Sequence, residues 1–210
     1  MYGIPLDLLQ HGLDVSQVRA YQLVQRWKRA RWVSSAKADA GPTWVYPTRA
    51  TATSYLGWDA DWIPRATTTG HVRAVAALRL YRTGFALDRW ISERTLRHEG
   101  GGWRRKSQVE PHVPDGIEVL ADGSRVLIEV ELTVKSPERM YQVIQDVRAR
   151  ASELDCAAVA YWCPPRVAPT VQRAIERYRT EWSGPAHQVN WHVQNIEEVP
   201  GWTVQKGQQS

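Results

Sequence analysis

In the middle of the chain, four charged residues have the types and spacing of an acidic catalytic site. They are Asp115, Glu129, Glu131 and Lys135. Between Val126 and Val134, apolar residues alternate with mostly polar ones, which is the period-two pattern of a half-buried strand. Because successive side chains of a strand point to opposite faces, Glu129, Glu131 and Lys135 are predicted to share the face away from the core.

A tight turn is predicted to bring Asp115 to the same place. Asp122-Gly123 is a strong two-residue turn signal, so residues 117–120 are expected to pair antiparallel with the strand that follows the turn. Asp115 then stands at the start of the first strand of this hairpin. A helix expected over residues 140–154 would cover the opposite face, against the apolar residues of the second strand.

Carboxylates this close to one another repel unless a cation neutralises them. Mg²⁺ commonly takes one or two carboxylates together with water and phosphate oxygens. We therefore expect Asp115 and Glu129 to ligate Mg²⁺ or Mn²⁺, which would activate water for phosphodiester hydrolysis. Glu131 or Lys135 would orient that water. The same alternation is also typical of an ordinary solvated sheet surface, and this alternative stays open at the level of sequence.

Two short motifs resemble the signature of the PD-(D/E)xK nuclease superfamily. They are Pro114-Asp115 and, after a gap, Glu129-Val130-Glu131. Glu131 stands where the motif has its Lys, and Lys135 follows four residues later; some restriction endonucleases of the superfamily also carry Glu there. The resemblance implies a nuclease-like αβββαβ domain. In that fold the opening helix often contributes another acid, for which Glu93 is the candidate.

The N-terminal region resembles a winged helix-turn-helix domain. A short helix is predicted over Pro5–Gln10, and Asp14 is a good N-cap for a second helix from Val15 to Ala30. Short strands beginning at residues 31 and 44 flank a polar turn and would form the wing. In such domains the second helix enters the major groove of DNA and the wing contacts the backbone. The alternative is a small helical cap that only packs on the second domain.

Basic and amide side chains mark the surface that would contact duplex DNA. Val18 and Trp27 are expected on the apolar face of the second helix, so the polar residues between them would face outward. A Gly-flanked basic loop before the hairpin would hold further phosphates. The candidate DNA-binding residues are Gln17, Arg19, Gln22, Arg26, Lys28, Arg29, Lys37, Arg104, Arg105 and Lys106.

Composition restricts the class of protein. The chain has 210 residues, 43% of them hydrophobic, and a formal net charge of +5, which allows one large or two small domains and suits an anionic partner. Cys156 and Cys163 flank a strand predicted to be buried and are interpreted as core thiols in a reducing cytosol. No apolar run approaches 18 residues, so a soluble cytoplasmic protein with no membrane partner is expected.

The order of predicted elements divides the chain into three parts. Residues 1–66 are assigned to the winged-helix domain, 67–204 to the nuclease-like domain and 205–210 to a disordered polar tail. Within the second part the pattern predicts helix, hairpin, helix, strand, helix and strand. Ser136-Pro137 is a strong helix start, and residues 156–162 form an apolar run typical of a buried strand. The expected fold class is therefore mixed α+β or α/β.

Several segments together resemble the replication-relaxation family of actinobacterial plasmids and integrative elements. They are the winged-helix segment, His71, WISERTLR at 90–97, PDG at 114–116 and IEVELTVKSPERM at 128–140. The resemblance covers most of the chain. It implies a DNA-binding protein that acts in plasmid replication or in the transfer of a mobile element.

Two functions are compatible with these patterns. The first is a Mg²⁺-dependent DNA endonuclease or nickase that is guided by the winged helix. The second is a non-catalytic replication or transcription factor, whose nuclease-like domain serves as a scaffold or as the interface of a homodimer. Asp115, Glu129 and Lys135 on one face favour the first, whereas Glu131 at the position of the motif's Lys favours the second. Fold alone does not decide between them.

Overall fold

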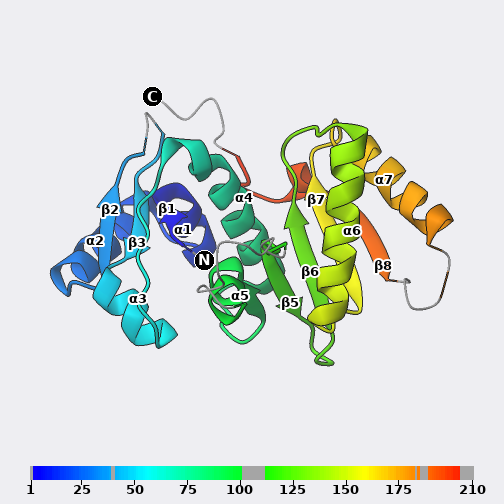
Figure 1. Cartoon of the computed structure of the whole chain (residues 1–210). Helices are drawn as coiled ribbons and strands as arrows, with labels where there is room; N and C mark the ends of the chain where they lie inside the picture. Colours follow the sequence, from blue (N-terminus) through cyan, green and yellow to red (C-terminus); the bar gives the residue numbers. More distant parts are fainter. Residues whose placement is uncertain (1, 39–40, 101–111, 183, 185–188, 204–210) are drawn as a thin grey trace. The chain divides into compact units, whose positions relative to one another are not determined.

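The computed structural model describes residues 2–38, 41–100, 112–182, 184 and 189–203. The described residues form seven α-helices and two sheets, which confirms a mixed α+β class (Figure 1). The chain separates into unit 1, Met1–Gly84 with Val199–Ser210, and unit 2, Phe85–Glu198. None of the described helices is long and apolar enough to cross a bilayer. The tail predicted over 205–210 lies outside the described residues.

Unit 1 combines a small antiparallel sheet with four helices in its described part. In chain order its elements are β1 (Ile4–Pro5), α1 (Leu6–Leu13), α2 (Gln17–Arg29), β2 (Val33–Ala36), β3 (Trp44–Pro47), α3 (Arg49–Leu56) and α4 (Ala66–Thr83). The strand order is β1-β3-β2, so the β2–β3 ribbon is completed by the strand that precedes α1. Strand β1 was not predicted, because two residues are too short to show a period-two pattern.

The turn between α1 and α2 differs in detail from the prediction. Asp14 does not cap α2; it ends α1 in a left-handed conformation (φ 51°), and its N–H bonds to carbonyls of α1. Ser16 is the N-cap of α2, where its hydroxyl accepts from the Arg19 N–H at 3.2 Å. The buried face of α2 carries Ala20 and Val24, whereas Val18, expected in the core, is 67% exposed.

Helix α4 belongs to unit 1, although the boundary was predicted near residue 66. The reason is a buried ion pair. The guanidinium of Arg73, which is 5% exposed, forms two hydrogen bonds with the Asp7 carboxylate, at 3.0 and 2.7 Å, and a third with the Gly201 carbonyl at 2.9 Å. These bonds connect α4 to α1 and to the segment after residue 198, a long-range contact that local sequence patterns do not reveal.

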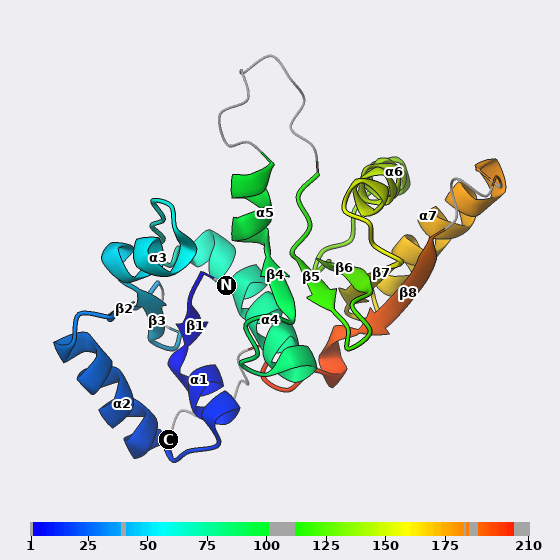
Figure 2. The same ribbon diagram turned by 90° about the horizontal axis from the view of Figure 1, so that it is seen from below.

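Unit 2 is a five-stranded sheet with helices α6 and α7 packed on one face. Its elements are β4 (Trp90–Ser92), α5 (Glu93–Glu99), β5 (Gly116–Val119), β6 (Arg125–Val130), α6 (Pro137–Glu153), β7 (Ala158–Cys163), α7 (Ala168–Glu181), β8 (Asn190–Asn195) and a 3₁₀ turn (Ile196–Glu198). The strand order is β4-β5-β6-β7-β8; β4 to β6 are antiparallel, and β6 to β8 are parallel. Figure 2 shows α6 and α7 on the same side of the parallel strands.

Local signals located most elements of unit 2 correctly. The turn between β5 and β6 contains Gly123 with φ 83°, and the Asp122 carboxylate accepts from the Ser124 N–H at 2.9 Å. Ser136 caps α6 through the Arg139 N–H, as predicted. Strand β7 is buried along its whole length, which confirms the predicted central strand. The edge strand β4 was missed, because the pattern predicted only a helix before the hairpin.

The prediction placed the side chains of β6 on the wrong faces of the sheet. Leu127 is fully buried in the core cluster that includes Met140 and Ile144 of α6, so Leu127 and Glu129 lie on the helix-covered face. Ile128 and Val130, on the other face, are also buried. A strand buried on both faces has no polar side to reveal its orientation. Glu129, which was expected on the outer face of the sheet, therefore lies on the face that α6 covers.

Candidate functional site

Asp115 connects the two strands of the hairpin at their open end. It directly precedes β5, and its N–H donates to the Ile128 carbonyl at 3.1 Å. Its carboxylate accepts a hydrogen bond from the Val130 N–H at 2.7 Å. The backbone N–H and the carboxylate of Asp115 are thus both bonded to β6, which fixes the residue against the end of that strand. The predicted partners Asp115 and Glu129 are thus brought to adjoining positions.

Glu129 is a carboxylate inside the protein, with only 8% of the residue exposed. It stands opposite Tyr161 in the parallel pairing of β6 with β7. Its Oε1 lies 2.7 Å from Nε2 of His112. A buried carboxylate is costly unless it is hydrogen-bonded or paired with a cation, and His112 supplies such a partner.

His112 was not predicted as a site residue, although it lies only three positions before Asp115. Burial alone lowers the pKa of its imidazole, but the hydrogen bond to Glu129 and the nearby charges of Asp115 and Asp146 raise the pKa above its ordinary value. The site therefore favours a positive charge next to Glu129. No pattern in the sequence identified His112, because its partner is 17 residues away.

Glu131 and Lys135 lie in the loop after β6, not on the strand. Strand β6 ends at Val130, so the alternation rule that placed them beside Glu129 does not apply. Oε1 of Glu131 accepts from the N–H and the hydroxyl of Thr133, at 3.1 and 2.9 Å, and Oε2 pairs with the Lys135 ammonium. Glu131 is thus stabilised within its own loop.

Lys135 remains electrostatically close to the acidic pair. Burial lowers the pKa of its ammonium group, and the charge of Arg139 lowers it further. Glu129 and Asp115 oppose this decrease, which places both carboxylates within electrostatic range of Lys135. Lys135 therefore stands at the edge of the site from which it could contact an anion.

Tyr161 is the second residue that the sequence did not identify. Its side chain is 1% exposed, and its hydroxyl has no hydrogen-bond partner among the described residues. Burial raises the pKa of the phenol well above its ordinary value, and the charges of Glu129 and Asp115 raise it further. A neutral phenol that keeps its proton at all physiological pH values therefore lies next to the acidic pair. Only the pairing of β6 with β7 would have revealed this neighbour.

Helix α6 contributes one more acid to the surroundings of the site. Asp146 is exposed, accepts from the Gln142 amide at 3.1 Å, and acts on the pKa values of both His112 and Tyr161. Because α6 covers the face that carries Glu129, Asp146 approaches from the helix rather than from the sheet. This acid was missed together with the face assignment of β6.

The remaining predicted site residues lie elsewhere or cannot be placed. Glu93 is in the first turn of α5, where its carboxylate pairs with Arg97 at 2.7 Å on the same helix. This i,i+4 pair is an ordinary helix-surface contact. The basic loop residues Arg104, Arg105 and Lys106 lie outside the described residues.

The donor set at Asp115 and Glu129 suits a hard divalent cation. Among the described residues, no group of three His, Cys, Asp or Glu side chains is close enough to hold a metal ion. Mg²⁺ does not require such a group, because it is often bound by one or two carboxylates with water and substrate phosphates completing its shell. The buried, unpartnered hydroxyl of Tyr161 fits that arrangement, since it can hydrogen-bond to an oxygen atom beside the carboxylates.

Helix α2 is a basic, acid-free surface in unit 1. All of the predicted contacts on it are exposed: Gln17, Arg19, Gln22, Arg26, Lys28 and Arg29. Within the described part of the chain, none of its four basic side chains forms an ion pair. Unit 1 has 12 Lys and Arg against 5 Asp and Glu, whereas unit 2 has 15 against 17. The net positive charge of the protein therefore comes from unit 1, in which Lys37 is also exposed.

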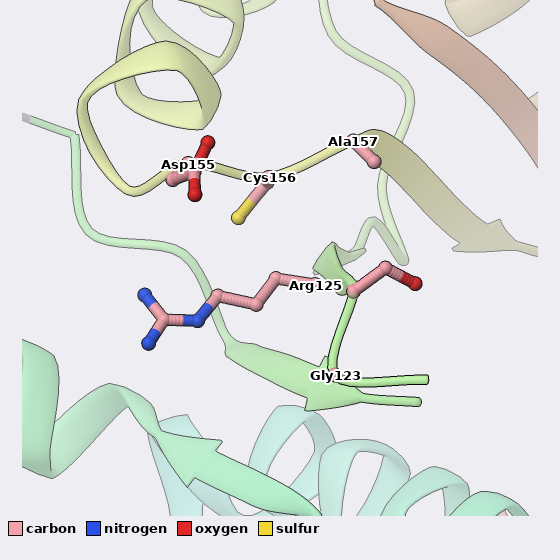
Figure 3. A pocket seen from close by; sticks show the side chains of 6 residues that line it. Gly123, Arg125, Asp155, Cys156 and Ala157 are labelled. Atoms are coloured by element: carbon pink, nitrogen blue, oxygen red, sulfur yellow. The ribbon is translucent and has the colours of Figure 1, made fainter. Parts of the chain in front are cut away.

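A pocket of about 400 Å³ lies at the opposite end of the sheet, where β6 and β7 begin (Figure 3). In Figure 3 the Cys156 thiol points towards the aliphatic part of Arg125. Burial raises the pKa of this thiol to about 11, so it is a poor nucleophile at neutral pH. The acidic pair is at the other end of β6, and we assign no chemistry to this pocket.

Comparison with family models, with curated proteins and with solved structures gives no significant match for this chain.

Proposed function

We propose that this protein binds duplex DNA through α2 and hydrolyses a phosphodiester bond with the help of a divalent cation at Asp115 and Glu129. The observation that carries the proposal is the position of these two carboxylates at adjoining ends of β5 and β6, where Asp115 accepts from Val130 at 2.7 Å. Two carboxylates at the end of a hairpin agree with the site that the nuclease motif implies.

In this proposal Asp115, Glu129 and Lys135 hold the cation and the phosphate. Asp115 and Glu129 would hold Mg²⁺ or Mn²⁺, which when bound supplies a Lewis acid and lowers the pKa of water. Lys135 would place its ammonium group against a phosphate oxygen after leaving Glu131. The order antiparallel hairpin, helix α6 and parallel strand β7 supports a nuclease-like fold for unit 2.

The proposed DNA contact has separate support in unit 1. A three-residue turn joins α1 to α2, and the β2–β3 ribbon follows directly, as in a winged helix-turn-helix. The exposed basic side chains of α2 are suited to phosphates, and Gln22 can reach the edge of a base. A role in replication or transfer of a mobile element rests on the family resemblance alone.

A non-catalytic DNA-binding factor is the second candidate, and one observation favours it. The acids already have cationic partners within the protein, since Glu131 pairs with Lys135 and Glu129 with His112. A site whose charges are internally neutralised needs no metal to remain folded. Unit 2 would then be a scaffold or a homodimer interface.

Cleavage of supercoiled plasmid distinguishes the two candidates. We expect the full chain to produce nicked or linear DNA with Mg²⁺ or Mn²⁺, and Asp115→Asn and Glu129→Gln to produce none. Glu153→Gln, which removes an acid at the exposed end of α6, is the matched control and should cleave like the wild type. If all four proteins bind duplex DNA and none cleaves it with either cation, the scaffold function is correct.

A further inference from the structure

The hydroxyl of Tyr161 is an unsatisfied polar atom in an otherwise well-packed core. The ring stacks on Trp191 with centroids 6.3 Å apart, and the residue is 1% exposed. The hydroxyl has no partner among the described residues. Leaving a buried hydroxyl without a hydrogen bond is unfavourable, and most buried hydroxyls in proteins have a partner.

Phenylalanine would provide the same ring without this cost. The core around Tyr161 is apolar, with Val159, Cys163 and Ile144 in the same cluster, so packing does not require the oxygen. Hydrogen bonds that become possible only when a ligand is present would account for the hydroxyl. The neighbour of Tyr161 across the strand pair is Glu129, and Asp115 is also within electrostatic range.

We propose that Tyr161 is a positioning residue, whose hydroxyl donates a hydrogen bond to a water molecule that enters the site with the divalent cation held by Asp115 and Glu129. The inference rests on the proposed cation site and adds a residue to it. Donation suits the hydroxyl, because carboxylate oxygens can only accept hydrogen bonds and a water between them and Tyr161 has a free lone pair. Removing a group that hydrogen-bonds to the ligands of a metal typically weakens metal binding by roughly 10- to 100-fold.

Cation binding to the full-length protein tests this inference without any measurement of cleavage. The free Mn²⁺ signal in electron paramagnetic resonance, recorded well below the unfolding temperature, gives the affinity of each variant. We expect Tyr161→Phe to bind Mn²⁺ roughly ten-fold more weakly than the wild type, the lower end of the range for such supporting residues. Tyr141→Phe is the control, since it also removes one hydroxyl. In the wild type that hydroxyl donates to Glu181, the last residue of α7, so this variant should bind Mn²⁺ like the wild type.

The outcomes separate the inference from the function on which it rests. If the wild type and Tyr161→Phe bind Mn²⁺ equally while Asp115→Asn does not bind it, the cation site is correct and the role of Tyr161 is wrong. If Tyr161→Phe lowers stability by the same amount with and without Mn²⁺ and leaves the affinity unchanged, the hydroxyl holds only a structural water, which also overturns the inference. If the wild type binds no Mn²⁺, both the cation site and the role of Tyr161 are wrong.

Discussion

Helix α2 of unit 1 and the acidic site of unit 2 hold their charged residues in opposite ways. In unit 1, the cations of α2 are exposed, have no acidic neighbour on their helix and form no ion pair with described residues. In unit 2, acids lie inside the protein with cationic neighbours: Glu129 with His112 at 2.7 Å, and Glu118, 2% exposed, near Arg89 at 4.0 Å. Exposed charges are screened and retain their solvation, whereas buried ones must be compensated.

The comparison shows what a ligand must do in each unit. In the proposed function, a polyanion that binds to α2 would displace only counterions and water, so its binding should depend strongly on salt. A cation that binds to Glu129 must compete with His112, and a phosphate that binds to Lys135 must separate it from Glu131. Binding of either ligand to unit 2 would therefore require ion pairs that already exist to rearrange.

The largest effect is expected from a change in the core of unit 2. Leu127→Ala removes a fully buried side chain between β6 and α6 and should lower the free energy of unfolding by about 2–5 kcal/mol. Denaturant unfolding followed by Trp fluorescence measures this loss. Duplex affinity of the folded variant should remain that of the wild type, because α2 belongs to unit 1. A parallel loss of affinity in folded protein would contradict the separation of roles.

Charge reversal on α2 should give the next largest effect. The triple variant Arg19→Glu, Arg26→Glu and Lys28→Glu should lose roughly 100-fold or more in duplex affinity at about 0.1 M salt, because three phosphate contacts become repulsive. Fluorescence anisotropy with a labelled duplex measures it. The control reverses three exposed arginines of α7 in unit 2, namely Arg173, Arg177 and Arg179. An equal loss in the control would mean that net charge, and not α2, determines binding.

The pH dependence of stability should reveal the His112–Glu129 pair. The pKa of His112 is raised in the folded state, so its stabilising contribution is complete below about pH 6.5, the ordinary value, and is lost as pH rises through the folded-state pKa. With a chelator present, the wild type should therefore lose stability above about pH 6.5 more steeply than His112→Gln. Thermal unfolding across this range measures the slopes, and exposed His192→Gln should follow the wild type. Identical slopes for all three proteins would refute the pair.

The smallest difference between variants is expected in the rate at which the two thiols, both in unit 2, react with a thiol reagent. Burial raises the pKa of Cys156 and of Cys163 to about 11, so the thiolate fraction at neutral pH should be roughly 100-fold lower than for an ordinary thiol. Reaction with a thiol reagent should be slow in the wild type and unchanged in the α2 variant. Leu127→Ala should accelerate it, because unit 2 opens more often. Acceleration in the α2 variant instead would show that the units do not open independently.

Several features of the fold followed from local chemistry and needed no knowledge of distant contacts. Asp122-Gly123 makes a tight turn wherever two strands flank it, and Ser136-Pro137 begins a helix because a hydroxyl and a fixed φ satisfy its first turn. The apolar run of β7 is too hydrophobic to lie at a surface. These signals predicted the hairpin, α6 and the central strand. They also predicted that Asp115 lies close to the strand that carries Glu129.

Tertiary structure decided what surrounds those acids. Strand β6 is buried on both faces, so its alternation did not indicate which face α6 covers, and Glu129 is on the helix side. Because β6 ends at Val130, Glu131 lies in the loop that follows, where its carboxylate contacts Thr133 and Lys135. Tyr161 reached Glu129 only through the parallel pairing of β6 with β7. Turns and caps depend on neighbouring residues and can be derived from sequence, whereas a buried charge depends on partners that only the folded chain brings near.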